Sequence, residues 1–151
     1  LLKQMGTPCL IHQPKYSMFE RWVENGLLDL LGNEGVGCIP FSPLAQGLLT
    51  NKYLKGIPQD SRVASHRGNG ALEDDQLTTA NLEKVHKLNA MAEQRGQTLA
   101  QMALAWIIKD TRVTSVLIGV SKPVQLTDSL LCMKNYAFSE NELNEIEAIL
   151  K

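Results

Sequence analysis

Three short segments of polar and small residues each follow an apolar run of the sequence, and their residue types suit ligand binding. Residues 12–17 lie at the end of the first run, residues 41–47 at the end of the second, and residues 119–122 at the end of the third. A glutamine side chain can hydrogen-bond an amide, and the ring of Phe41 can stack on a flat ring. The third segment precedes a predicted helix, whose free backbone N–H groups suit a phosphate. These segments are therefore candidate binding positions, but they define no reaction.

Each candidate also has an ordinary structural interpretation. Gln13 can stabilise a turn, Phe41 can be a core aromatic, and Ser121 can cap a helix after a β-α turn. Lys122 can add a positive charge beside a phosphate, but the segment matches neither the Walker loop nor the GxGxxG motif. The residue types alone leave a binding role and a structural role open at each position.

Three apolar runs are predicted to be the strands that position these segments. They span residues 8–13, 36–41 and 114–119, and each is short, nearly continuous and bounded by Gly or Pro. Such runs are typical of strands that are buried on both faces of a parallel sheet covered by helices. Because ligands bind at the carboxyl ends of parallel strands, we expect the three segments to meet at one edge.

Helical patterns separate the predicted strands and follow the last of them. The predicted helical segments are residues 19–31, 78–95, 99–109, 123–133 and 140–150. Thr98 is a good N-cap for the third segment, and Pro123 suits the first turn of the fourth. Ser139 with Glu142 three residues later forms a capping box for the last segment. The apolar face expected on the third segment comprises Met102, Ala103, Trp106 and Ile107.

Glycines and a polar tract interrupt this pattern. Gly26 breaks the first helical segment, and either Gly32 or Gly35 can end it. Residues 50–77 are polar and show no period, so we predict a long surface loop there. No internal repeat or linker divides the chain, which predicts a single α/β domain. The element order fits either a doubly wound sheet or an arc of a (β/α) barrel.

Composition excludes several classes of function. The chain of 151 residues is 44% hydrophobic and 21% charged, which is typical of an ordinary globular protein. A formal net charge of −1 offers no basic surplus for nucleic acid or a membrane surface. No apolar run reaches the roughly 20 residues of a membrane-spanning helix. Cys9, Cys38 and Cys132 lie in apolar contexts without metal-binding spacing, which predicts buried thiols in a reducing cytoplasm.

The residues alone identify no catalytic group. His86 lies in a helical pattern beside a lysine and is predicted to be exposed, and His66 lies in the polar tract. His12 adjoins the first strand end, but the alternation of a strand points it away from Gln13. No Ser/His/Asp arrangement and no metal-ligand spacing is present in the sequence. We therefore predict no catalytic residue and no metal site in this chain.

Four blocks of the sequence resemble the aldo-keto reductases, in that family's order and over essentially the whole chain. The blocks are residues 13–21, 41–53, 98–106 and 115–121. Their most specific parts are Ser-Pro-Leu-Ala-x-Gly-x-Leu from position 42 and Ser-Val-Leu-Ile-Gly-x-Ser from position 115. The chain is most similar to the branch that contains bacterial glyceraldehyde 3-phosphate reductases and potassium-channel β subunits. The resemblance implies the C-terminal part of a (β/α)8 TIM barrel, with its sixth, seventh and eighth strands and their helices.

The resemblance also implies cofactor contacts at all three strand ends. Gln13 is expected to bind the nicotinamide carboxamide, and Phe41 to stack on the nicotinamide ring. The pyrophosphate is expected along Ser42, Pro43, Leu44, Ala45 and Gln46, with Lys52 and Arg62 reaching over the cofactor. The adenosine and its 2′-phosphate are expected at Gly119, Ser121, Gln125, Asp128 and Ser129. NADP(H) is the implied cofactor, but many relatives carry Arg where Gln125 stands and Asn where Ser129 stands, so NAD remains open.

The implied activity is the NADP(H)-dependent reduction of an aldehyde or ketone, such as a glyceraldehyde 3-phosphate-like compound, to an alcohol. The family's catalytic Asp, Tyr, Lys and His come from earlier strands, and no block of this chain matches them. Residues 1–151 are therefore expected to be one partial domain that holds cofactor but is inactive alone. A small carbonyl substrate, a cytoplasmic location and a homo-oligomer fit this expectation. The alternatives are a non-catalytic NADP-binding subunit of the channel-β type and a stand-alone half-barrel that binds NADP or a partner.

Overall fold

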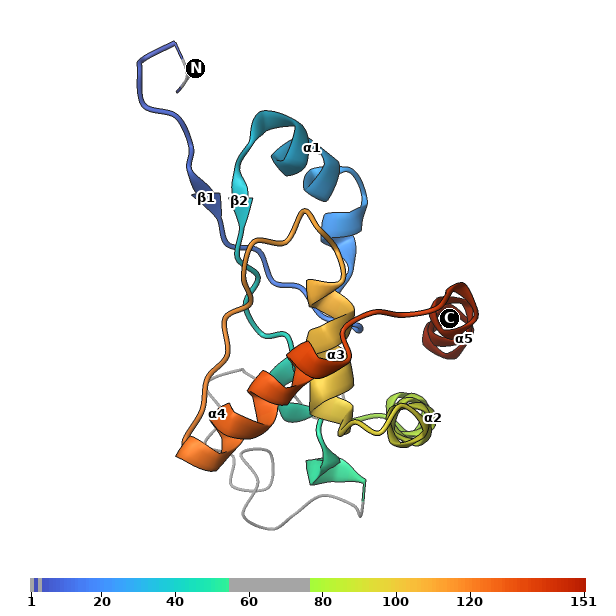
Figure 1. Ribbon diagram of the computed structural model, residues 1–151. Helices are drawn as coiled ribbons and strands as arrows, with labels where there is room; N and C mark the ends of the chain where they lie inside the picture. Colours follow the sequence, from blue (N-terminus) through green and yellow to red (C-terminus); the bar gives the residue numbers. More distant parts are fainter. Residues whose placement is uncertain (1, 3, 55–76) are drawn as a thin grey trace.

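Two short parallel strands run side by side in the computed structural model (Figure 1), which describes residues 2, 4–54 and 77–151. Strand β1 (Ile11–His12) pairs with β2 (Gly37–Cys38), with Ile11 opposite Gly37 and His12 opposite Cys38. The helix between them crosses over the sheet, as a parallel connection requires. The strands confirm the α/β class expected from the first two apolar runs.

The third apolar run lies along the other edge of β2. Val113 forms an isolated parallel bridge with Cys38. The N–H groups of Thr114 and Leu117 donate to the carbonyls of Cys38 and Pro40 at 2.8 and 2.9 Å. The run is therefore extended and parallel to β2, but its ladder is too incomplete to form a strand, contrary to the prediction.

The predicted burial of the strands on both faces is also wrong. Cys38 is buried and Val116 packs on the core, but the side chain of Leu10 is 73% exposed and Ile11 and Leu117 are also exposed. The physical reason is that the described helices cover one face of the sheet only. The same lack of neighbours explains why β1 and β2 are shorter than the apolar runs that contain them.

The helices follow the predicted order. They are η1 (Trp22–Glu24), α1 (Leu27–Glu34), η2 (Ala45–Gly47), η3 (Asn51–Tyr53), α2 (Thr79–Gln94), α3 (Leu99–Ile108), α4 (Pro123–Leu130), η5 (Leu131–Lys134) and α5 (Glu140–Leu150). Thr98 and Gln101 form a reciprocal capping box on α3, and Ser139 and Glu142 form another on α5. Pro123 occupies the first turn of α4. These local predictions are confirmed because each depends on residues within one helical turn.

Gly35, rather than Gly32, ends α1. Gly35 has a φ of 66°, in the left-handed region that a residue with a Cβ rarely adopts. Its N–H donates to the carbonyls of Gly32 and Leu31, which closes the last turn of the helix. Gly26, with a φ of 94°, separates η1 from α1, as its position in the pattern predicts.

Helix α3 is the centre of the core. Its side chains are buried on every side, so the prediction of a single apolar face was too narrow. Helix α2 packs on one side of α3 and α4 and η5 on another (Figure 1). A helix that is apolar all round is stable only when it is surrounded in this way. The core therefore forms between α3 and the strand ends, where the candidate residues lie.

The described residues bear on three further expectations, which concern the cysteines, His86 and membrane-spanning helices. Cys38 and Cys132 are buried, but Cys9 is exposed, because no described element covers the segment that precedes β1. His86 is exposed on α2, as predicted. No helix within the described ranges is long and apolar enough to cross a membrane. Arg62 and His66 belong to residues 55–76, which lie outside the described residues.

The lowered pKa of Glu142 predicts how the free energy of unfolding depends on pH. Hydrogen bonds from Ser139, first from its N–H at 2.6 Å, together with the Arg95 guanidinium, lower the pKa of this carboxyl. A lowered folded-state pKa stabilises the fold above the unfolded-state pKa of about 4.3, and that stabilisation is lost as pH falls through the folded value. We expect Glu142→Gln, which keeps the capping oxygen, to flatten the loss of unfolding free energy between pH 5 and pH 3 (roughly the range of carboxyl titration). Urea unfolding at both pH values measures this, and parallel losses in the two proteins would contradict it.

Candidate functional site

The carboxyl ends of the three extended segments lie next to one another. The N–H of Phe41 donates to the carbonyl of Pro14 at 2.9 Å, which joins the first segment to the second. The N–H of Leu117 donates to the carbonyl of Pro40 at 2.9 Å, which joins the second to the third. Gln13 is exposed at this edge. The first two segments and the third run at Leu117 therefore meet at one edge, which is the candidate site. Residues 119–122 continue from this edge to the start of α4.

Phe41 lies in the middle of this edge. Its N–H is bound to Pro14, and its carbonyl accepts from the N–H of Tyr16 at 3.3 Å. Its side chain is 38% exposed, so the ring is neither fully buried in the core nor loose on the surface. A backbone held on both sides with a partly exposed ring can offer a flat apolar surface to a ligand. The partial exposure of the ring shows that Phe41 is not a purely core aromatic.

The turn after Phe41 is strained. Ser42, Ala45 and Gln46 have φ values of 56°, 46° and 58°, although none of them is glycine. Such conformations cost of order 1–3 kcal/mol each and persist at sites where the surrounding structure enforces them. Leu44 and Leu48 anchor the turn in the core, and the Gln46 amide donates to the Ser42 hydroxyl at 3.3 Å. Strain at this position is a feature that no sequence pattern indicated.

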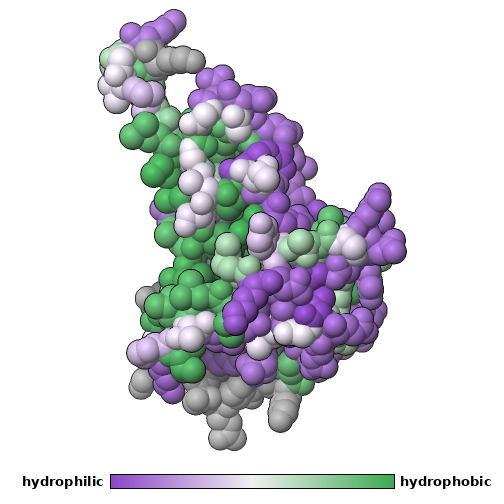
Figure 2. Space-filling view, viewed as in Figure 1, coloured by the Kyte–Doolittle hydropathy of each residue, from purple (hydrophilic) through white to green (hydrophobic). Residues whose placement is uncertain are grey.

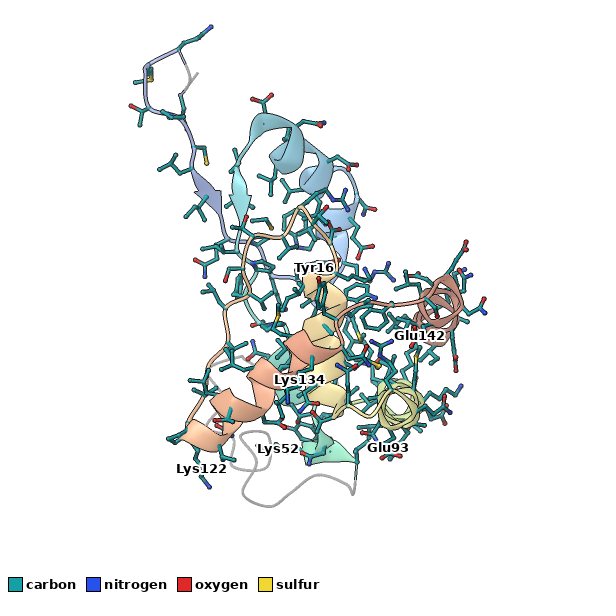
Figure 3. All side chains as sticks on the ribbon, in the orientation of Figure 1. Tyr16, Lys52, Glu93, Lys122, Lys134 and Glu142 are labelled. Carbon is teal, nitrogen blue, oxygen red and sulfur yellow. The ribbon has the colours of Figure 1, made fainter. Side chains whose placement is uncertain are left out.

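The side chain of Gln125, in the first turn of α4, accepts hydrogen bonds from backbone N–H groups at the start of the same helix. The Gln125 side-chain oxygen accepts from the N–H groups of Ser121 and Lys122 at 2.7 and 3.1 Å. These are the free N–H groups at which a phosphate was expected. Gly119 and Ser121 are exposed beside them, and Figure 3 shows Lys122 at the start of α4. A neutral amide oxygen therefore already satisfies this helix end in the isolated chain.

The remaining predicted residues lie in two different environments. The Asp128 carboxylate accepts from the Gln101 amide at 2.7 Å, and Ser129 is buried beside it, so both face α3. These contacts fasten α4 to α3. Lys52 is exposed on η3, with its ammonium 5.7 Å from the centre of the Tyr53 ring. Their roles toward a cofactor stay predictions.

No described tyrosine has the environment of a general acid. Tyr16 is buried and donates to Glu24 Oε1 at 2.8 Å, and burial followed by this carboxylate raises the pKa of its phenol above the usual value. Tyr53 is buried at the end of η3, and Tyr136 is exposed. A proton donor needs a pKa near the working pH and a place at the reacting atoms. That the catalytic residues lie outside this chain stays a prediction.

An apolar surface borders the candidate site. The exposed large apolar side chains on the strands and α4 include Leu10, Ile11, Leu117, Val120, Val124, Leu126 and Leu130. Figure 2 shows hydrophobic residues along the side of the molecule where the strands and α4 lie. Soluble domains rarely leave such surfaces uncovered.

Comparison with known proteins identifies the family. An α/β fold with candidate ligand positions at the carboxyl ends of parallel strands defines the general class. The model of the Aldo/keto reductase family matches residues 1–151. The chain therefore belongs to the aldo-keto reductase family, as its motifs predicted.

Two curated relatives show which members it resembles. The L-glyceraldehyde 3-phosphate reductase of Escherichia coli K12 is 56% identical over an alignment of 151 positions that covers 97% of this chain and 43% of that protein. An Arabidopsis thaliana protein, named probable voltage-gated potassium channel subunit beta, is 41% identical over an alignment of 127 positions that covers 80% of this chain and 37% of that protein. The chain thus spans less than half the length of these relatives.

A solved structure supports the fold. The glycerol dehydrogenase of Gluconobacter oxydans superposes with a TM-score of 0.74 at 21% sequence identity. The match covers 93% of this chain and 42% of that one. At this identity the likeness concerns the fold, and it agrees with an α/β piece of a larger protein.

Proposed function

We propose that this chain is the cofactor-binding part of a longer NADP(H)-dependent reductase of small aldehydes or ketones. The observation that carries the proposal is that two strand ends and the extended third run meet beside Phe41, with the strained turn directly after it. The relative named for L-glyceraldehyde 3-phosphate supports a phosphorylated or otherwise small aldehyde as the substrate. Within the family fold, the chain supplies strands six to eight of the barrel. A cytoplasmic, homo-oligomeric protein is part of the same proposal.

The described residues fit a nicotinamide dinucleotide. Phe41 offers a partly exposed ring, and Gln13 is an exposed amide beside it. The strained turn from Ser42 suits the pyrophosphate, since backbone N–H groups can meet an anion there. The adenosine phosphate is proposed at the start of α4, where it would replace the Gln125 oxygen on the N–H groups of Ser121 and Lys122. When bound, the cofactor supplies a hydride. The residues of this chain bind and orient it, and they exclude water from one side of it.

The proton that a carbonyl oxygen needs must come from outside this chain. Tyr16 is buried with a raised pKa and is bonded to Glu24, and Tyr53 is also buried. Residues from the part of the relatives that this chain does not span are therefore proposed to supply it. The apolar surface of the strands and α4 is proposed to pack on that part. Both points follow from the proposal that residues 1–151 are a partial domain.

Turnover tests this proposal. We expect the full-length protein that contains residues 1–151 to oxidise NADPH in the presence of glyceraldehyde 3-phosphate, and residues 1–151 alone to show no turnover. NADPH absorbance measures both rates. Turnover by residues 1–151 alone would overturn the assignment of the catalytic groups to another segment.

A non-catalytic function is the second candidate. The channel-β relative from Arabidopsis supports it, because that protein is named as a channel subunit rather than as an enzyme. In this case the full-length protein binds NADPH tightly but turns over none of a panel of small aldehydes and ketones. The two candidates therefore differ in turnover and agree in cofactor binding.

A further inference from the structure

Tyr16 lies behind Phe41 and has no part in the proposed cofactor contacts. Its backbone N–H donates to the Phe41 carbonyl at 3.3 Å. Its side chain is 1% exposed, and its ring centroid lies 5.6 Å from that of Trp106 on α3. Figure 3 shows Tyr16 beside α3, in the interior of the molecule. Tyr16 therefore connects the backbone of the strand end to the core.

The phenol of Tyr16 ends in a network of charged side chains. It donates to Glu24 Oε1 at 2.8 Å, and Arg21 donates to the same carboxylate from Nε at 2.9 Å and Nη2 at 2.7 Å. Arg21 also pairs with Glu147 of α5 at 2.7 Å. The guanidinium lies 5.1 Å from the centre of the Trp106 ring. Elements distant in sequence thus hold the tyrosine ring in one orientation.

Phe41 is held by two neighbours, of which only Tyr16 has a side chain fixed by a polar contact. The Pro14 carbonyl accepts from the Phe41 N–H, but the proline ring has no polar group that could form a further hydrogen bond. Tyr16 holds the Phe41 carbonyl, and its own side chain is fixed by packing and by a hydrogen bond to a charged acceptor. Hydrogen bonds to charged groups are stronger than neutral ones. Groups that orient a binding residue affect ligand affinity although they do not touch the ligand.

We infer that Tyr16 is a positioning residue, whose phenol, bonded to Glu24, sets the place of Phe41 at the strand end. The inference rests on the proposed function, in which Phe41 stacks on the nicotinamide ring. Tyr16 does not touch the cofactor and transfers no proton. Its effect reaches the ligand through the Phe41 backbone.

A double-mutant cycle in the full-length protein tests the inference. Tyr16→Phe removes only the phenol oxygen and leaves the ring against Trp106. We expect this variant to raise the Kd for NADPH roughly 3- to 10-fold, since the lost hydrogen bond joins a charged acceptor. In a Phe41→Ala background the same change is expected to leave the Kd unaltered, because contacting or coupled residues are not additive. Fluorescence titration with NADPH measures all four proteins.

Each other outcome overturns a defined statement. An equal increase in both backgrounds, or no increase in the native background, overturns the positioning role of Tyr16. A Phe41→Ala variant that binds NADPH as the native protein does overturns the proposed nicotinamide position instead. Arg95→Lys is the control for general loss of stability, because Arg95 lies at the junction of α2 and α5 and makes no contact with the strand ends. It is expected to lower the unfolding midpoint without changing the Kd.

Discussion

Phe41→Ala is expected to weaken NADPH binding by the full-length protein by about 1–3 kcal/mol, the range for loss of a stacked aromatic ring. This is roughly a 5- to 150-fold increase in Kd. The reason is the position of Phe41, whose backbone is held between Pro14 and Tyr16 while its ring remains 38% exposed. Fluorescence titration with NADPH gives the Kd directly. The fold is expected to remain, because the ring is not part of the buried core.

Trp22→Ala is the matched control. Trp22 is also a partly exposed aromatic residue, at 49%, but it lies on η1 rather than at a strand end. Its replacement is expected to change the Kd by less than about twofold, as surface substitutions away from a site usually do. If the two substitutions raise the Kd for NADPH equally, Phe41 does not stack on the cofactor.

Arg95→Ala is expected to lower the free energy of unfolding by about 1–3 kcal/mol, the range for leaving hydrogen-bonding groups without their partner. The Arg95 side chain is 5% exposed and pairs with Glu142 of α5. Its guanidinium also donates to the carbonyls of Asn135 and Ala137 at 3.1 and 2.8 Å, and it stacks 3.8 Å from the Phe138 ring centre. One side chain thus joins α2 to the segment that leads into α5. Urea unfolding of the protein measures the loss.

Arg112→Ala provides the comparison for this prediction. Like Arg95, Arg112 forms ion pairs, and its partners are Asp110 and Asp29. Its side chain, however, is 35% exposed. Solvent screens such pairs, so we expect a loss of about 1 kcal/mol or less. If the two substitutions destabilise the protein equally, burial is not the reason for the importance of Arg95.

Local patterns predicted the elements of this protein well. The capping residues of α3 and α5 and the proline of α4 each act within one turn of helix, so neighbouring residues determine them. The positions of β1 and β2 were also predictable, because short apolar runs bounded by Gly or Pro are typical of parallel strands, but the third predicted strand is only an extended segment. The exposure of one face of the strands was not predictable, since burial depends on which other segments are present to cover that face.

The sequence by itself determined the family, the order of elements and the set of strand-end residues, because motifs and periodicity are properties of adjacent positions. The tertiary structure alone decided how those residues are held. It directed Asp128 to α3 and joined Tyr16 through Glu24 and Arg21 to α5. These contacts join elements that are distant in the sequence, so no short spacing in the chain encodes them.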